Sequence, residues 1–139
     1  MLTGLIIGLI VVAVLSVFVS RRPPPPIDAD FGPDAVSFTT ATPAEEAFKV
    51  AEALPLGASY KLGRADAAKA RVILRDGMTM NSYGYFYAVD VASSAGGSTV
   101  TVNAKSKYPM QFGPIVKRQR EAARQKLVDA LKAKLAGAI

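Results

Sequence analysis

The sequence predicts an α+β protein in which an N-terminal transmembrane helix precedes a small antiparallel sheet packed against one short helix and one long C-terminal helix. Three observations lead to this fold class. The first 20 residues carry no charged side chain. Apolar and polar residues then alternate in several short runs, and apolar residues recur at helical spacing before and after most of these runs. We expect a transmembrane anchor over 1–20, a proline-rich linker over 21–34 and a small α+β domain over 35–139.

The apolar segment 1–20 is long enough to cross a membrane, because a helix rises about 1.5 Å per residue and the hydrocarbon core of a bilayer is roughly 30 Å thick. A cleaved signal peptide would show basic residues before a shorter apolar run, and then a small-residue cleavage site. The sequence has neither feature. A buried core helix would not be apolar on every side. We therefore expect an uncleaved anchor.

The residues in and beside this segment predict its packing and orientation. Gly4 and Gly8 form a GxxxG motif, which favours close packing against another membrane helix. Arg21 and Arg22 follow the segment directly, and no basic side chain precedes it. Since positive flanks stay in the cytoplasm, we expect the N-terminus outside and the C-terminal domain in the cytoplasm. The expected partners are the lipid bilayer and other membrane protein subunits.

A run of four prolines, Pro23–Pro26, follows the apolar segment. Such a run favours the extended polyproline II conformation, so we expect a short stiff spacer and then an irregular acidic lead-in over 27–34. Alternating apolar and polar residues over 35–41 predict a first strand.

A short helix is expected next. Thr42 matches an N-cap, Pro43 suits the first helical position and Glu45 completes a capping box. The apolar stripe continues to about Leu54, where Pro55 ends the helix.

The middle of the chain is predicted as antiparallel strands joined by turns. The Asp76–Gly77 pair and the glycine-rich stretch 93–98 are hairpin signals. Ala65–Ala70 is ambiguous, because its alanines favour a helix but it is short. A long helix over 115–135 closes the chain, with an apolar stripe on one face and basic residues on the other. The expected strands cover 59–63, 71–75, 78–92 and 99–105.

The composition excludes several classes of site. The chain has no Cys and no His, which removes the usual zinc ligands and the commonest general base. No glycine-rich loop links a strand to a helix, so a nucleotide site is not expected. The carboxylates are scattered and no pair converges. We therefore expect no enzyme activity, no cofactor, no metal site and no catalytic residue.

The most distinctive side chains are Tyr83, Tyr85 and Tyr87, which share one face of a predicted strand. They are candidates for a face that binds an apolar ligand or a partner, although ordinary strand packing explains the same pattern. A nucleic-acid platform would place basic residues beside the aromatics. The neighbours here are Asp76 and Asp90, so we expect no nucleic-acid partner.

The net charge of +6 is concentrated at two places, beside the apolar segment and on the last helix. These basic residues are candidates for contact with anionic headgroups or an acidic partner, while a solvated helix face is the alternative. The candidates are Arg21, Arg22, Lys117, Arg120 and Arg124.

Two stretches, SFTTATPAEEAFKVAEAL and GPIVKRQREAARQKLVDALKAKL, resemble the SRPBCC superfamily of START-like and polyketide-cyclase-like domains. The first is a strand that leads into a Thr-Pro-capped helix, and the second is the long closing helix. The resemblance covers 36–54 and 113–135 only, and the family usually has more strands and a longer chain between these two helices. It implies a helix-grip sheet that holds an apolar ligand or a partner, and no family site residue carries over.

These observations together predict a non-enzymatic, single-pass membrane protein that serves as an accessory or assembly subunit of a larger membrane complex. The alternative is a membrane-tethered, SRPBCC-like module that binds a lipid or another hydrophobic ligand.

Overall fold

The computed structural model describes residues 23–54, 60–76, 84–106 and 114–137. The transmembrane anchor predicted over 1–20, with Gly4 and Gly8, lies outside these residues, as do Arg21, Arg22 and Tyr83. The described elements run in the order β1 (Val36–Thr40), α2 (Ala44–Ala53), β2 (Lys61–Asp66), β3 (Arg71–Arg75), β4 (Tyr85–Ser94), β5 (Gly97–Ser106) and α3 (Pro114–Gly137).

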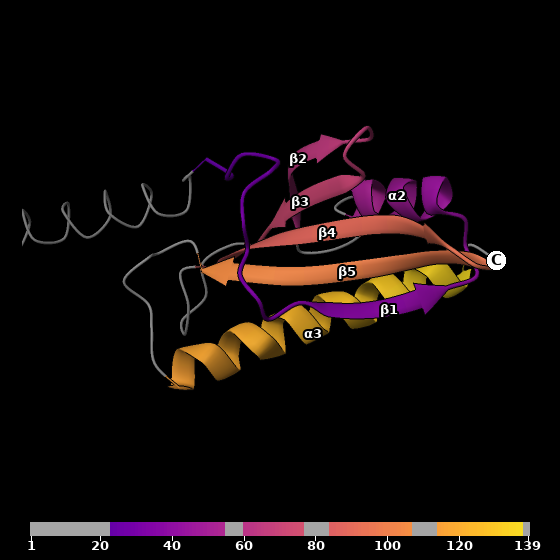
Figure 1. Cartoon of the computed structure of the whole chain (residues 1–139). Coiled ribbons are helices and arrows are strands. Elements are labelled where there is room, and N and C mark those ends of the chain that lie inside the picture. The colour runs from indigo at the N-terminus through magenta and orange to yellow at the C-terminus, as the bar shows by residue number, and fades with distance from the viewer. Residues whose placement is uncertain (1–22, 55–59, 77–83, 107–113, 138–139) are drawn as a thin grey trace, which may run out of the picture.

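The five strands form one antiparallel sheet in the order β1-β5-β4-β3-β2 (Figure 1). The β4–β5 hairpin is its longest pairing, with Ser94 opposite Gly97 across a two-residue turn, as the glycine-rich stretch predicted. Only glycine fits at position 97, because a Cβ there would lie 2.0 Å from the carbonyl oxygen of Thr40. The close approach joins the end of β1 to the start of β5.

Both helices cover the same face of this sheet and enclose the main core. Alternate residues of β3, β4 and β5 point into this core, where they meet the apolar stripes of α2 and α3, as the period-2 and helical patterns predicted. An antiparallel sheet gripped by one short and one long helix is therefore confirmed. The buried helix residues are Ala47, Ala51, Leu127, Val128, Leu131 and Leu135.

The start of α2 differs from the predicted capping box. Pro43 occupies the N-cap position, and no side chain caps the helix. Thr42 is buried instead, where its backbone N–H donates to the Thr40 hydroxyl (3.3 Å) and its carbonyl accepts from the Ser98 hydroxyl (2.8 Å). Thr42 therefore ties β1 to β5, and this tertiary contact replaces the local cap.

The ambiguous stretch 65–70 forms the end of β2 and a turn, not a helix. Asp66 determines this turn, because its carboxylate accepts hydrogen bonds from the backbone N–H groups of Ala68 (2.9 Å) and Lys69 (3.2 Å). Such a side chain competes with the helical pattern of backbone hydrogen bonds. Ala70 then adopts a left-handed conformation with φ 52°.

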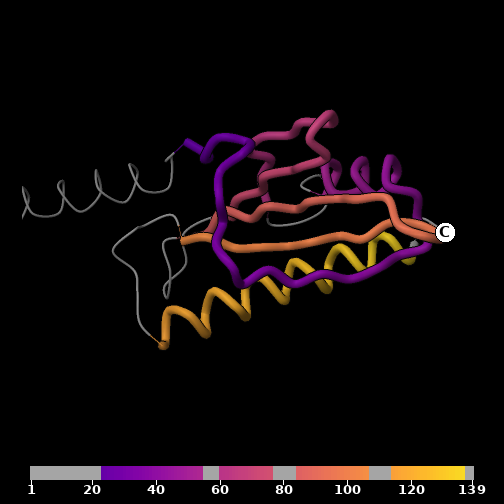
Figure 2. Tube along the Cα trace, viewed as in Figure 1, coloured from indigo at the N-terminus to yellow at the C-terminus, as the bar shows by residue number. Residues whose placement is uncertain are grey.

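The lead-in 27–34 packs across the outer face of the sheet, the face that the helices leave uncovered. Figure 2 shows this segment crossing β4 and β5 on its way to β1. Ile27, Ala29 and Phe31 pack there against Ile73, Phe86 and Ala88.

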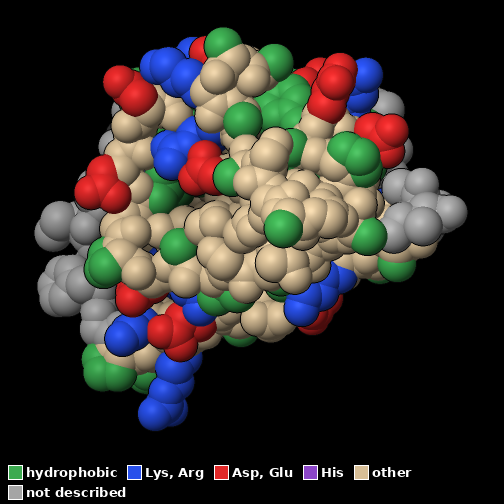
Figure 3. All heavy atoms as spheres, turned by 45° about the vertical axis from the view of Figure 1, so that its right-hand side comes forward, with side chains coloured by type: hydrophobic (Ala, Val, Ile, Leu, Met, Phe, Trp, Pro, Cys, Tyr) green, Lys and Arg blue, Asp and Glu red, His purple; other side chains and the backbone are tan. Residues whose placement is uncertain are grey.

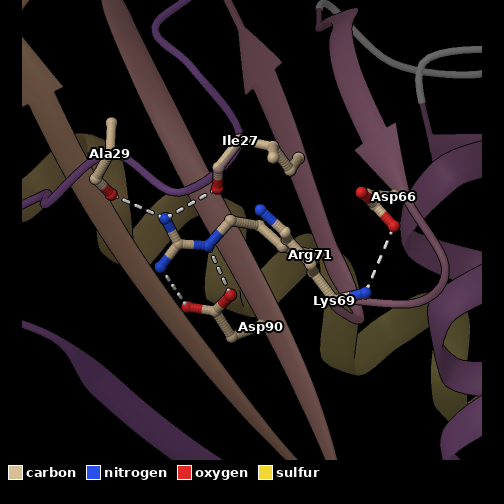
Figure 4. Close-up of polar contacts among 6 residues, drawn as sticks. All are labelled: Ile27, Ala29, Asp66, Lys69, Arg71 and Asp90. Carbon is tan, nitrogen blue, oxygen red and sulfur yellow. Dashed lines mark hydrogen bonds and ion pairs between the residues drawn. The ribbon is translucent and has the colours of Figure 1, made fainter.

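Arg71 of β3 holds the lead-in in place (Figure 4). Its guanidinium forms a two-point ion pair with Asp90 of β4 (2.6 and 3.0 Å) and donates to the carbonyls of Ile27 (3.2 Å) and Ala29 (2.7 Å). The Phe31 ring also lies 5.6 Å from the guanidinium carbon. One side chain thus links the lead-in to two strands of the sheet.

In the part of the chain that the structure describes, no helix is both long enough and apolar enough to cross a membrane. Among these helices, α2 spans 10 residues, and α3, with 24 residues, carries many charged side chains.

Candidate functional site

Of the three tyrosines named from the sequence, the two that the structure describes are core residues, not an exposed face. Tyr85 and Tyr87 lie on the helix-facing side of β4 and are 4% and 1% exposed. Tyr60, which directly precedes β2 and is not part of the tyrosine row in the sequence, joins them, with its ring edge-on to Tyr87 at 5.6 Å between centroids. These rings are therefore hidden from a partner surface in the described structure.

Asp76 gives this aromatic cluster a polar end. Its carboxylate accepts the Tyr87 hydroxyl (2.6 Å) and the backbone N–H of Tyr85 (2.6 Å). Burial, reinforced by the hydrogen bond to this carboxylate, raises the pKa of Tyr87 well above its ordinary value of 10.0. Burial and the charge of Asp76 also raise the pKa of Tyr60. Both phenols therefore stay protonated at neutral pH, and Tyr87 acts as a fixed donor.

Side chains fill the space between the sheet and α3 among the described residues. Tyr87, Leu74, Leu127 and Leu131 are each less than 2% exposed and meet in one core. A ligand between these side chains would have to displace them, at a cost of several kcal/mol. The helix-grip interior that the family resemblance implied is therefore not the open site in this part of the chain.

An open groove of about 430 Å³ lies instead between α2 and the β2–β3 turn. Its helical wall consists of residues spaced so that they share one face of α2, with the Phe48 ring as the largest apolar surface. Ala67 and Ala70 form the opposite wall. The remaining lining residues are Ala44, Glu45, Lys49 and Glu52.

The opposite wall of this groove is held rigidly. Asp66 anchors the turn, as described above, and the Ala70 carbonyl accepts the backbone N–H of Val91 (3.0 Å). The left-handed conformation of Ala70 costs about 1 kcal/mol relative to an ordinary backbone. The contacts of the turn with β4 offset this cost and keep the groove wall in one position.

The rim of the groove carries charge while its floor is apolar. Glu45 and Lys49 form an exposed i,i+4 pair at 3.9 Å, and Glu52 has no ion-pair partner among the described residues. Figure 3 views the molecule with this end turned forward and shows hydrophobic side chains bordered by acidic and basic ones at the upper right. Such a site suits a small apolar molecule and offers it a carboxylate at the edge.

The basic candidates of α3 take part in contacts within the chain. Arg120 pairs with the Asp34 carboxylate (3.4 Å), and Arg124 donates to the Asp34 carbonyl. Lys117 lies 4.0 Å from Glu121 one turn along the helix. Arg120 and Arg124 thus connect α3 to the end of the lead-in.

No cluster of three or more His, Cys, Asp or Glu side chains that could hold a metal ion occurs within residues 23–54, 60–76, 84–106 and 114–137.

Comparison with known proteins bears on the fold. No protein-family model and no curated protein matches this chain. Among solved structures, the chain is similar to the crystal structure of Ara h 8.0201, with a TM-score of 0.52 and 12% sequence identity over 74% of this chain and 96% of that chain. At this identity the similarity establishes the fold alone. The helix-grip arrangement of an antiparallel sheet with one short and one long helix, which the family resemblance implied, is thus confirmed.

These findings correct the predicted function and localisation. The described residues form a helix-grip domain with the fold of Ara h 8.0201, and no helix among them could span a bilayer. The prediction of an accessory or assembly subunit of a membrane complex, with its N-terminus outside and its domain in the cytoplasm, is corrected by this fold to a helix-grip domain. That prediction relied on the hydropathy of 1–20, whereas the rest of the chain folds around its own core.

Proposed function

We propose that this domain is a non-enzymatic binding module for a small apolar molecule, which it takes up in the groove between α2 and the β2–β3 turn. The observation that carries the proposal is the groove of about 430 Å³, with Phe48 on one wall and a rigid alanine turn on the other. Its volume falls within the range of about 300 to 1,000 Å³ typical of small-molecule sites.

The chemistry of the lining supports binding without catalysis. Apart from the rim charges, the lining side chains are alanines and one phenylalanine, which offer neither nucleophile nor general base. Burial of apolar ligand surface against them would supply the affinity, at roughly 25 cal/mol per Å². The carboxylate of Glu52 favours a ligand that is neutral or carries a positive group over an anionic one.

A pair of neighbouring substitutions tests this proposal in the full chain. Ala67→Trp fills the groove from the turn, whereas Ala68→Trp adds the same ring at an exposed position that does not line it. The probe is N-phenyl-1-naphthylamine, a neutral aromatic dye whose fluorescence rises in apolar surroundings. We expect Ala67→Trp to weaken its binding by about tenfold or more, which corresponds to about 1.4 kcal/mol.

The matched variant provides the control, because Ala68→Trp should bind the dye as the wild type does. Amide chemical shifts of residues 44–52 and 67–70 should move on titration in the wild type and in Ala68→Trp only. Equal binding by the two variants, or shifts confined to other residues, would refute a site in this groove.

A further inference from the structure

The two edges of the sheet are built differently. At the β2 edge, Arg64 donates from its side chain to the backbone carbonyls of Pro25 (2.9 Å) and Pro24 (3.3 Å). The β2 register shifts between Leu62 and Arg64, which interrupts the regular pairing. This strand also carries Lys61, Arg64 and Asp66. Charge, irregular register and a covering segment are the devices that prevent a further strand from joining an edge.

The β1 edge has none of these devices among the described residues. Val36–Thr40 has the sequence VSFTT, without charge or proline, and its register with β5 runs without a shift. Within the described chain, no backbone–backbone hydrogen bond outside the sheet involves these five residues. An edge strand donates and accepts backbone hydrogen bonds on one side only, so the other side of β1 is left to solvent.

A groove of about 220 Å³ runs alongside this open edge, between β1 and the last turns of α3. Phe38 lies on its β1 side and Leu135 on its α3 side. The exposed Lys132 stands over Phe38, with its ammonium 5.3 Å from the ring centroid. Lys132 has no carboxylate partner in the described structure. The open edge is thus bordered by an apolar recess with one positive charge.

We propose that β1 accepts an extended segment of a partner protein as a sixth strand of the sheet. The segment's backbone pairs with the free side of β1, one apolar side chain enters the recess between Phe38 and Leu135, and an acidic side chain lies near Lys132. Strand addition uses backbone hydrogen bonds for affinity and alternate side chains for specificity. The acidic residue follows from the unpaired positive charge of Lys132.

A second copy of this chain fits the edge less well than an acidic segment does. Pairing of two β1 strands about a twofold axis at Phe38 would bring the Lys132 residues of both copies to one interface. No carboxylate among the groove-lining residues would compensate them. This site lies at the opposite edge of the sheet from the α2 groove, so the two proposals stand or fall separately.

The test uses the full chain and two model peptides, Ac-GVTETVTG-NH2 and Ac-GVTKTVTG-NH2, in which the valines and the central charged residue lie on one face of the strand. We expect the glutamate peptide to bind and to move the amide shifts of residues 36–40, 135 and 136, while the lysine peptide does not. Lys132→Glu should weaken binding of the glutamate peptide by about fivefold. Lys134→Glu makes the same change of net charge at an exposed residue outside the groove, so it should leave the affinity unchanged.

Equal effects of Lys132→Glu and Lys134→Glu would overturn the proposal, because they would reduce it to the overall charge of α3. Equal binding of both peptides, or no shift in β1 with either, would also overturn it. A concentration-dependent dimer with the same β1 shifts in the absence of peptide would assign the edge to a second copy instead. The result that supports the proposal is binding of the glutamate peptide that moves the β1 amide shifts and is weakened by Lys132→Glu but not by Lys134→Glu.

Discussion

Replacement of Arg71 by methionine should release the lead-in from the outer face of the sheet. Methionine keeps much of the length and apolar character of the side chain, so the change isolates the guanidinium. Four hydrogen bonds are lost, two to Asp90 and one each to the carbonyls of Ile27 and Ala29. The contact with the Phe31 ring is lost as well.

The expected cost follows from these contacts and their exposure. A hydrogen bond to a charged group contributes about 1.5 to 3 kcal/mol when it is well shielded. The Asp90 side chain is 39% exposed, however, and can rehydrate when Arg71 is removed, so the pair contributes only part of this. The two carbonyls lose their donor, and the contact with the ring adds about 0.5 to 1 kcal/mol. We expect Arg71→Met to lower the free energy of unfolding by about 2 to 3 kcal/mol.

Urea unfolding measures this loss, and amide hydrogen exchange shows where it occurs. Exchange over residues 27–34 should quicken more than exchange in β4 and β5, because the lead-in opens before the sheet does. Lys69→Met removes the same charge from an exposed side chain nearby and should change stability by less than about 0.5 kcal/mol. If Arg71→Met unfolds like Lys69→Met and the lead-in exchanges at the wild-type rate, the contacts of Arg71 with the lead-in do not contribute to stability.

Three further changes test the core, the hairpin and the turn. Above about pH 10 the unfolded chain loses the Tyr87 proton while the folded chain keeps it, so the free energy of unfolding should fall by about 1.4 kcal/mol per pH unit from this group. Urea unfolding at several pH values measures this slope, which should be smaller in Tyr87→Phe. Equal slopes in the wild type and in Tyr87→Phe would contradict the raised pKa. Gly97→Ala, whose Cβ would lie 2.0 Å from the Thr40 carbonyl oxygen, should cost about 3 kcal/mol. Gly96 has φ 79° and open space around its Cβ position, so Gly96→Ala should cost only about 1 to 2 kcal/mol. If thermal unfolding shows Gly96→Ala to be less stable than Gly97→Ala, the predicted clash at position 97 is refuted. Asp66→Ala removes the acceptor of two backbone N–H groups and should lower the free energy of unfolding in urea by about 1 kcal/mol. Because this turn forms one wall of the groove, the dye should also bind more weakly, and unchanged dye binding would contradict the role of Asp66 in holding that wall.

The elements with strong local periodicity could be predicted from the sequence. The prediction of 71–75 matches β3, and 99–105 and 115–135 lie within β5 and α3. Each of these segments buries one face, so its hydrophobic period reports its structure directly. The predicted strand 78–92 overlaps β4 from Tyr85 onward, and its first part lies partly outside the described residues.

The contacts between distant segments could not be predicted in the same way. The capping box predicted at Thr42 does not form, because Pro43 occupies the N-cap position and Thr42 is buried, where its carbonyl accepts from the Ser98 hydroxyl. In the lead-in, Ile27, Ala29 and Phe31 alternate with Asp28 and Asp30, which is the period of a chain with one buried face. That signal was present, but the acidic residues, Gly32 and Pro33 favoured an irregular lead-in.

The candidate site shows the same limit. The tyrosine row was visible because aromatic residues on alternate positions stand out in a sequence, and the structure places the described members in the core. The α2 groove depends on small residues, Ala67 and Ala70, whose importance lies in the space they leave. An alanine in a turn gives no chemical signal, so only the packing of the turn against α2 could reveal the groove.

The lead-in also has a practical consequence for making this domain as a recombinant fragment. A fragment cut just before β1 would include all five described strands and both described helices, yet Ile73, Phe86 and Ala88 would lose their cover and face water. Such a fragment should aggregate on storage, whereas one that starts at Pro23 should remain dispersed. The best place to cut this chain therefore lies well upstream of its first strand.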